Sequence, residues 1–307
     1  MLLALTGTPA ATARTVPIGI GEQQPSVFSD PRWIRLGMVH ARYLTPWDTL
    51  AHRHARGELD AWMAAARSAR ARVTLSFRHG HRARRDAREF PTPARFKAAF
   101  LGSRRRYPDV RSYIVWNEAN HPLSYSAHHP RRVAKLFDVA ARNCHGCRIV
   151  GADALDVTGM LAWVRAFLRG AHERPRVWGL HNYVGVRERQ SFSTRALLAA
   201  VRGRIWFTET GGWLVRQKLK RGRVMQAFHT NAHQAARATR FALRLACVSR
   251  RIARVYLYNW QAPWRVTTWD SGIIGPRGNP RPAYGVLRRQ FRRSGSASAR
   301  CRHGTMR

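Results

Sequence analysis

Two glutamates, Glu118 and Glu209, each follow a run of apolar, β-branched and aromatic residues. Such a run is typical of a buried strand. The carboxyl ends of buried parallel strands carry the chemistry of barrel enzymes. If both side chains face one cleft, one carboxyl group can act as an acid and the other as a nucleophile. Two opposed carboxyl groups of this kind can hydrolyse a glycosidic bond.

A structural role is the alternative for either glutamate. Most glutamates are solvated, and 55 Lys and Arg residues offer salt-bridge partners. That alternative does not explain why Glu118 and Glu209 both end apolar strands among Trp, Asn and Tyr. If the pair is catalytic, we expect the proton affinity of the acid to be raised relative to that of the nucleophile.

The elements that must position these residues alternate along the chain between short apolar runs and helical patterns. The predicted strands cover residues 16–23, 35–43, 73–77, 148–154, 177–183, 204–208 and 254–260, and the stretch 112–122 opens as the fourth strand. The predicted helices cover residues 59–70, 92–101, 130–142, 158–171, 193–201, 224–248 and 282–291. Eight strands alternating with helices predict a single (β/α)8 barrel over residues 14–291. A doubly wound sheet is the rival fold, but no glycine-rich phosphate-binding motif follows any strand.

The strand ends resemble those of the retaining glycoside hydrolases of clan A. This (β/α)8 superfamily includes cellulase-like, β-xylosidase-like and α-arabinofuranosidase-like enzymes. The resemblance rests on Trp116-Asn117-Glu118 after the fourth predicted strand and Phe207-Thr208-Glu209 after the seventh. It is supported by His181-Asn182-Tyr183 after the sixth strand and Asn259-Trp260 after the eighth.

The resemblance implies a role for each matched residue. Glu118 would be the acid/base and Glu209 the nucleophile of a double displacement on a polysaccharide or oligosaccharide. Asn117 would hydrogen-bond the sugar 2-hydroxyl, and this bond would strengthen in the transition state. Tyr183, together with His181, would steady the nucleophile.

Aromatic residues near the same strand ends are candidates for sugar binding. By the resemblance, Trp260 would offer a ring face to the C–H surface of the sugar. Trp213, Trp264 and Trp269 lie in loops after the last two predicted strands. We select Trp264 and Trp269 as sugar-subsite candidates. Asp270 either binds a sugar hydroxyl or caps a turn, and the turn is favoured.

The arginine and histidine that such enzymes often carry on early strands cannot be placed uniquely. We select Arg42 and His79 as substrate-binding residues. His40 and Arg78 remain alternatives, because a one-residue error in strand parity turns the opposite set of side chains inward. A solvated position is an equal alternative for each of the four.

The composition is strongly basic, with a net charge of +39 and a pI near 11.9. The arginines are scattered over the whole chain, and no zinc-finger, helix-turn-helix or RNA-binding motif accompanies them. We therefore expect nonspecific adhesion to polyanions rather than a specific nucleic-acid partner. A non-catalytic carbohydrate- or polyanion-binding barrel is the alternative function. We expect no cofactor and no metal, since the carboxylates are few and separated and retaining hydrolysis needs no ion.

The cysteines and the chain ends bear on the compartment. Cys144 and Cys147 lack a second pair and precede a strand, which favours a local disulfide or two structural thiols over a zinc or redox site. Cys247 and Cys301 stand alone in the sequence.

Residues 1–13 resemble a truncated signal peptide, which predicts a secreted protein. Residues 292–307 are predicted to be a disordered basic tail. Nothing between these ends approaches the ~20 apolar residues of a membrane span.

Overall fold

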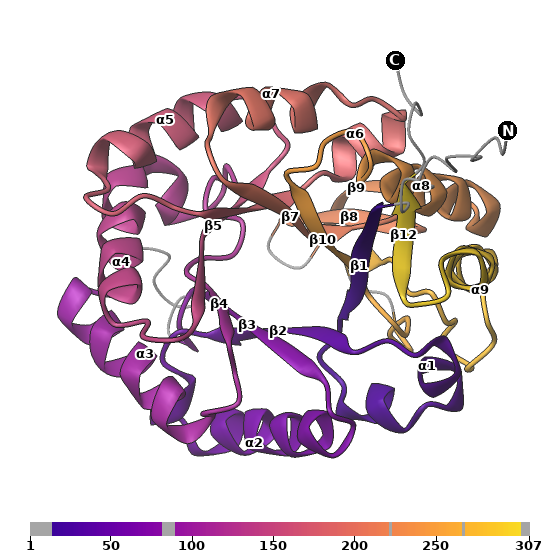
Figure 1. Ribbon diagram of the computed structural model, residues 1–307, viewed down its shortest axis with the longest axis horizontal. Coiled ribbons are helices and arrows are strands. Elements are labelled where there is room, and N and C mark those ends of the chain that lie inside the picture. The colour runs from indigo at the N-terminus through magenta and orange to yellow at the C-terminus, as the bar shows by residue number, and fades with distance from the viewer. Residues whose placement is uncertain (1–13, 82–89, 221–222, 266–267, 302–307) are drawn as a thin grey trace, which may run out of the picture.

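The computed structural model describes residues 14–81, 90–220, 223–265 and 268–301, excluding the side chains of residues 218–225. Eight parallel strands pair in chain order, and the last returns to the first, so that the sheet closes (Figure 1). The barrel strands are β1 (Arg14–Gly21), β2 (His40–Pro46), β3 (Arg72–Arg78), β4 (Ser112–Ile114), β5 (Arg148–Leu155), β6 (Val177–His181), β7 (Arg204–Thr210) and β10 (Ile252–Tyr258). The predicted (β/α)8 barrel is confirmed.

Helices surround the barrel on its outer side (Figure 1). They are α1 (Pro31–Leu36), α2 (Arg53–Ser68), α3 (Pro93–Arg106), α4 (Pro130–Arg142), α5 (Met160–Gly170), α6 (Tyr183–Glu188), α7 (Phe192–Ala200), α8 (Ala232–Leu245) and α9 (Pro282–Ser294). Short 3-10 turns η1 (Pro25–Ser29), η2 (Thr49–Ala51) and η4 (Tyr125–His128) lie in the loops. As predicted, α3 starts at Thr92 and Pro93: the Thr92 side chain accepts a hydrogen bond from the Arg95 amide. Among the described residues, no helix combines the length and apolar character that a bilayer crossing requires.

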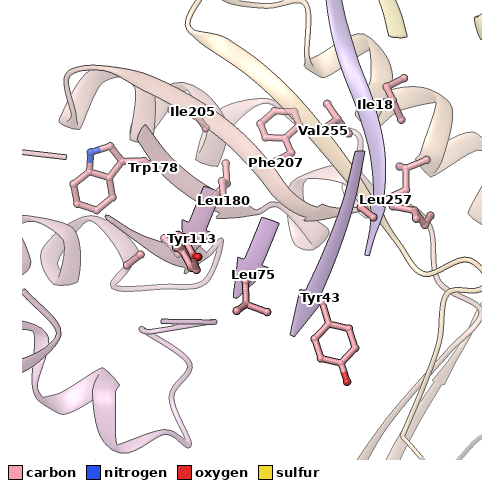
Figure 2. Close-up of a cluster of buried hydrophobic side chains, with 14 of the residues drawn as sticks. Ile18, Tyr43, Leu75, Tyr113, Trp178, Leu180, Ile205, Phe207, Val255 and Leu257 are labelled. Atoms are coloured by element: carbon pink, nitrogen blue, oxygen red, sulfur yellow. The ribbon is translucent and has the colours of Figure 1, made fainter. Parts of the chain in front are cut away.

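The strands bury apolar side chains on both faces. Inside the barrel, Ile114, Val150, Val177, Trp206 and Tyr256 form one small cluster. On the outer face, a larger layer packs between the strands and the helices, and Figure 2 shows part of it. In that layer the Trp178 ring centroid lies 5.3 Å from that of Phe167, and Tyr113 lies 5.1 Å from Phe100. This packing fixes the strands, and their carboxyl ends can then hold polar side chains.

The predicted helix over residues 224–248 is wrong in its first part. The helix α8 begins only at Ala232, where Asn231 and Gln234 form a capping box. The preceding residues form the antiparallel strands β8 (Val215–Lys220) and β9 (Arg223–His229), and the short strand β11 (Trp269–Asp270) pairs with β8. Backbone pairing within this three-stranded sheet replaces the expected loop and first helical turns.

The predicted disorder from Arg292 onward is wrong up to residue 301. The helix α9 continues to Ser294, and β12 (Ser298–Cys301) pairs antiparallel with the start of β1. Cys301 forms a disulfide with Cys247, so neither cysteine stands alone. Backbone pairing and this covalent link hold a segment that its composition marked as mobile. Residues 302–307, and the predicted signal peptide at residues 1–13, lie outside the described residues.

The two disulfides should differ in what they contribute to stability. Cys247–Cys301 spans a sequence separation of 54, whereas the local Cys144–Cys147 disulfide spans only 3. Because a larger closed loop removes more entropy from the unfolded chain, replacing both Cys247 and Cys301 with serine should lower the free energy of unfolding by about 4 kcal/mol. The matched Cys144→Ser/Cys147→Ser variant should lose only about 2 kcal/mol. Denaturant unfolding without reductant measures both values, and equal losses would contradict the prediction.

Candidate active site

Arg42 lies at the centre of a buried polar cluster at the carboxyl ends of the strands. Its guanidinium donates hydrogen bonds to Glu209 Oε1 at 2.6 Å, to Asn117 Oδ1 at 2.6 Å and to Asp153 Oδ2 at 2.9 Å. Burial alone would lower the pKa of Arg42, but the charges of Glu209 and Asp153 outweigh it and raise that pKa. Arg42 is therefore a permanent cation that links β2 to β7, to β5 and to the segment after β4. The structure thus brings the predicted residues Arg42, Asn117 and Glu209 together.

Glu209 reaches the cluster because β7 is irregular. In a regular strand consecutive side chains point to opposite faces, yet Thr208 donates to Asp153 at 2.5 Å while Glu209 contacts Arg42. The register between β6 and β7 shifts here: Leu180 pairs with Phe207, whereas His181 pairs with Glu209. A bulge of this kind re-aims side chains near active sites. It turns two adjacent residues of β7 toward the barrel interior.

Glu118 reaches the same place through a turn in the backbone. The segment after β4 stays paired with its neighbours, since the Asn117 amide donates to Phe77 O and the Ala119 amide to Asp153 O. Glu118 itself adopts a left-handed conformation with φ of 43°, which is unusual for a residue other than glycine. As a result, one carboxylate oxygen of Glu118 lies within 4.8 Å of one oxygen of Glu209.

His181 connects the two glutamates. Its Nδ1 lies 3.2 Å from Glu118 Oε1 and 3.6 Å from Glu209 Oε2, and its Nε2 lies 3.3 Å from Asp153 Oδ2. Burial would lower the pKa of His181, but the charges of Glu209 and Asp153 and the hydrogen bonds of the cluster raise it to about 10. The ring is therefore an imidazolium at neutral pH.

The pKa of Glu118 shifts in the direction opposite to that expected of an acid. Burial acts to raise this pKa, but the hydrogen bond and charge of His181, with His121 and Arg42, outweigh it and lower the pKa. In the free protein Glu118 is thus a carboxylate paired with an imidazolium. The sequence pattern could not show this, because the effect depends on the 3.2 Å contact between side chains from two different strands.

The His181 imidazolium should make stability depend on pH in the alkaline range. Since its pKa is about 10 in the folded protein against 6.5 for an ordinary histidine, its contribution is complete below pH 6.5. It is lost as the pH rises toward 10, and is at most about 5 kcal/mol. A His181→Gln variant should lack this decline between pH 6.5 and 10, whereas a variant at the exposed His54 should keep it. Urea unfolding at several pH values measures the decline in the free energy of unfolding. If this free energy fell with pH equally in His181→Gln and in the wild type, His181 would not be its source.

Asp153 belongs to the site although it was not selected from the sequence. It is completely buried, and it contacts Arg42, His181 and Thr208. Burial would raise its pKa, but His181 and Arg42 lower it, so the side chain is a carboxylate. Gly179 makes room for it, because a Cβ atom at that position would overlap Asp153 Oδ1. The one feature of the sequence that could have pointed to Asp153 is that it is an acidic residue within an otherwise apolar predicted strand.

Tyr183 contacts the nucleophile candidate Glu209, and Trp269 packs against Tyr183. The Tyr183 hydroxyl donates to Glu209 Oε2 at 3.3 Å, and its role in steadying the nucleophile stays a prediction. The Trp269 ring packs edge-on against Tyr183 with centroids 4.9 Å apart, and Trp213 packs behind it at 5.9 Å. Asp270 pairs with Arg281 and accepts the Gly272 amide, which agrees with the turn interpretation.

Trp260 does not offer a face to the cleft, contrary to the prediction. The side chain is fully buried, and its indole N–H donates to Asp30 at 2.9 Å. Its ring packs edge-on against Trp33 and Tyr284. The apolar surface that the sequence assigned to a sugar is therefore used in packing. Trp264 is exposed, and its contact with a sugar stays a prediction.

A cavity of about 310 Å³ opens beside Glu118. Arg78 and His79 line it from the end of β3, and Phe90, Trp116 and Tyr125 line it with aromatic rings. His79 thus borders the candidate site, and Arg78, its alternative, borders it as well. His40, the alternative to Arg42, lies two residues before it on β2 and is buried. Burial and the charges of Arg254 and Arg72 lower the pKa of His40 to about 3.

Comparisons with known proteins identify the fold. Neither a scan against protein-family models nor a search of curated proteins by sequence finds a match. Among solved structures, an endo-1,4-β-xylanase from Caldicellulosiruptor owensensis has a TM-score of 0.63 at 10% identity, covering 89% of this chain and 96% of its own. A fungal β-1,4-galactanase has a TM-score of 0.61 at 12% identity, with 90% and 100% covered. A family 39 glycoside hydrolase from Bacteroides cellulosilyticus WH2 has a TM-score of 0.56 at 13% identity, and the alignment covers 89% of this chain but only 63% of that one. The chain shares the barrel fold of these glycoside hydrolases.

Proposed function

We propose that the protein is a retaining glycoside hydrolase that cleaves O-glycosidic bonds of a polysaccharide or oligosaccharide by double displacement. The observation that carries the proposal is the approach of Glu118 and Glu209 oxygens to within 4.8 Å. Retaining enzymes hold their two carboxyl groups ~5–5.5 Å apart, whereas inverting enzymes leave ~6.5–9.5 Å for a water molecule. The fold shared with xylanases and a galactanase supports the same class of reaction.

In the first step Glu209 is the nucleophile. One of its oxygens forms a bond to the anomeric carbon while the bond to the leaving oxygen breaks, and Glu118 gives that oxygen a proton. Arg42 and Tyr183 each hold one oxygen of Glu209, which orients the carboxylate before attack. The Asn117 side-chain oxygen accepts a hydrogen bond from Arg42, the same group that holds Glu209, and Asn117 is the candidate ligand for the sugar 2-hydroxyl.

Glu118 acquires its proton when substrate binds. Its side chain is the more exposed of the two, at 29% against 9% for Glu209. A bound sugar covers it further, and loss of water favours the protonated form of a carboxyl group. In the second step water attacks the anomeric carbon, Glu118 accepts the proton of that water, and the bond to Glu209 breaks. The carboxylate form that the lowered pKa of Glu118 favours in the free protein is the one that the second step needs.

We further propose that the protein acts outside the cytoplasm. The two disulfides, Cys144–Cys147 and Cys247–Cys301, support this location because such bonds persist in oxidising compartments. Fractionation of cells that produce the full chain tests the proposal. Recovery of the protein only in the cytoplasm, with its cysteines reduced, would contradict it.

The stereochemistry of the first product tests the proposed mechanism. A panel of aryl glycosides that includes β-xylosides, β-galactosides and α-arabinofuranosides is incubated with the protein, and ¹H NMR identifies the first anomer released. Retention of configuration is expected, and the inverted anomer would overturn double displacement. No turnover on any substrate, with equal retention on a glycan column for the wild type and Glu209→Ala, would favour the non-catalytic binding barrel. Salt-sensitive binding to heparin alone would show only the polyanion adhesion that a net charge of +39 supports.

A further inference from the structure

Asp48, His52 and His81 form a second cluster of titratable side chains, apart from the glutamates. Asp48 follows β2, His52 lies one turn later at the start of α2, and His81 lies in the loop after β3. Asp48 Oδ2 is 3.1 Å from His52 Nε2, and Asp48 Oδ1 is 2.9 Å from His81 Nδ1. One oxygen or nitrogen from each of the three side chains lies within 4.8 Å of the others.

The three side chains make up a set of ligands that transition-metal ions prefer. Two imidazoles and one carboxylate are common ligands of Zn²⁺ and its first-row neighbours. Ligand bonds of ~2.0–2.2 Å in a tetrahedral zinc site place neighbouring ligand atoms roughly 3.3 Å apart. The observed contacts of 2.9 and 3.1 Å, one to each carboxylate oxygen of Asp48, are slightly shorter than this spacing.

The backbone around Asp48 preorganises this cluster. The His81 amide donates to both carboxylate oxygens, at 3.1 and 3.2 Å. Gly80 permits the close approach, because a Cβ atom there would lie 2.9 Å from Asp48 Oδ2 and 2.8 Å from Trp47 Nε1. The Asp48 side chain is 9% exposed, whereas those of His52 and His81 are 38% and 30% exposed. A largely covered carboxylate beside two partly exposed imidazoles leaves a path for an ion and for water ligands.

We propose that Asp48, His52 and His81 bind one Zn²⁺ ion, or a similar divalent transition-metal ion, with water completing the coordination. The ion would join the loop after β2 to the loop after β3. Arg78 and His79, which line the cavity beside Glu118, directly precede Gly80 and His81. The site is therefore structural, and it holds one wall of that cavity in place. This proposal differs from the prediction, made from the sequence, that the protein has no metal site. The proposal does not depend on the proposed hydrolase activity.

A competing cluster in the described part of the chain, formed by Glu118, His181 and Glu209, is a poorer metal site. Its ligand atoms also lie within 4.8 Å of one another. However, the Arg42 guanidinium lies 2.6 Å from Glu209 Oε1 and already supplies a positive charge there. Its histidine is also protonated at neutral pH, and a metal ligand must be a neutral imidazole.

Titration of the full-length protein with metal ions tests the proposal. After treatment with chelator and desalting, wild-type protein is titrated calorimetrically with ZnCl₂ in 150 mM salt, and with CoCl₂ while visible absorption is recorded. We expect one ion per chain, and a Tm increase of about 5 °C at a hundredfold excess over Kd. His52→Ala and His81→Ala should each weaken binding by at least about tenfold. His54→Ala removes an exposed histidine of the same helix and should bind as the wild type does.

Three outcomes would overturn the proposal. One is wild-type binding no tighter than that of the His52→Ala/His81→Ala double variant. Another is that the double variant still binds one ion per chain while Glu118→Gln binds none. That result would place the ion at the glutamates. The third is equal weakening in His54→Ala. Circular dichroism of every variant separates loss of binding from loss of folding, and Asp48→Asn, which keeps the side-chain shape, should bind weakly while remaining folded.

Discussion

Replacing Glu209 with alanine should lower turnover of aryl glycosides by about 10⁴-fold or more, because the attacking carboxylate is lost. Sodium azide should restore part of the activity on substrates with a good leaving group. Azide enters the space vacated by the side chain and attacks the anomeric carbon from the same face. The product should be a glycosyl azide of inverted configuration, because only one displacement then occurs.

The control for this experiment is Glu188→Ala. Glu188 is a surface residue that pairs with its neighbour Arg187, and its loss should leave turnover unchanged. Thermal unfolding of both variants checks that they fold. Wild-type turnover by Glu209→Ala would remove Glu209 as the nucleophile, and failure of azide to give any glycosyl azide would count against a glycosyl-enzyme intermediate.

Replacing Arg42 with methionine should lower the free energy of unfolding by about 3–5 kcal/mol, because it leaves buried carboxylates without their counter-charge. The fully buried Asp153 and the largely buried Glu209 both lose a direct ion pair. Hydrolysis should fall as well, since Glu209 and Asn117 lose the group that orients them. Denaturant unfolding and aryl-glycoside turnover measure the two effects.

Arg67→Met is the matched control for Arg42→Met. Arg67 pairs with Asp109 at 2.9 Å, but both side chains are largely exposed, and such a pair contributes at most about 1 kcal/mol. Adding Asp153→Asn to Arg42→Met should recover part of the lost stability, because one unpaired buried charge is removed. Equal losses for the two arginine variants would show that the Arg42 cluster does not stabilise the fold.

The barrel could be predicted from the sequence because strand and helix patterns alternate over nearly its whole length. Glu118 and Glu209 could be selected because each ends an apolar strand, and a closed sheet brings such ends together. Asp153 could not be distinguished from Asp156, which lies three residues later and binds the backbone amides of Val184 and Gly185. Asp153 joins the cluster because its side chain points toward the barrel interior, where the absence of a Cβ atom at Gly179 leaves space for it.

Contacts between distant segments account for the errors. Trp260 was assigned to the sugar by the resemblance to clan A enzymes, but Asp30 and Trp33, at the N-cap of α1 and within it, hold its ring in the core. The strands β8 and β9 pair with each other, and β8 pairs in addition with a short strand some 50 residues further along the chain. Cys247 and Cys301 looked unpaired because no local spacing links them. The lowered pKa of Glu118 likewise depends on a histidine from a different strand.

The pairing of β12 with β1 has a practical consequence for engineering. Arg14 and Cys301 are register partners at the edge of the sheet, at the amino-terminal end of β1. Glu118, Arg42 and Glu209 lie at the opposite, carboxyl ends of the strands. A tether or fusion partner attached at either of these positions would therefore leave the cleft open to large glycans. A short peptide joining residue 301 to residue 14 would also give a circularly permuted chain, whose new termini could be placed in any surface loop.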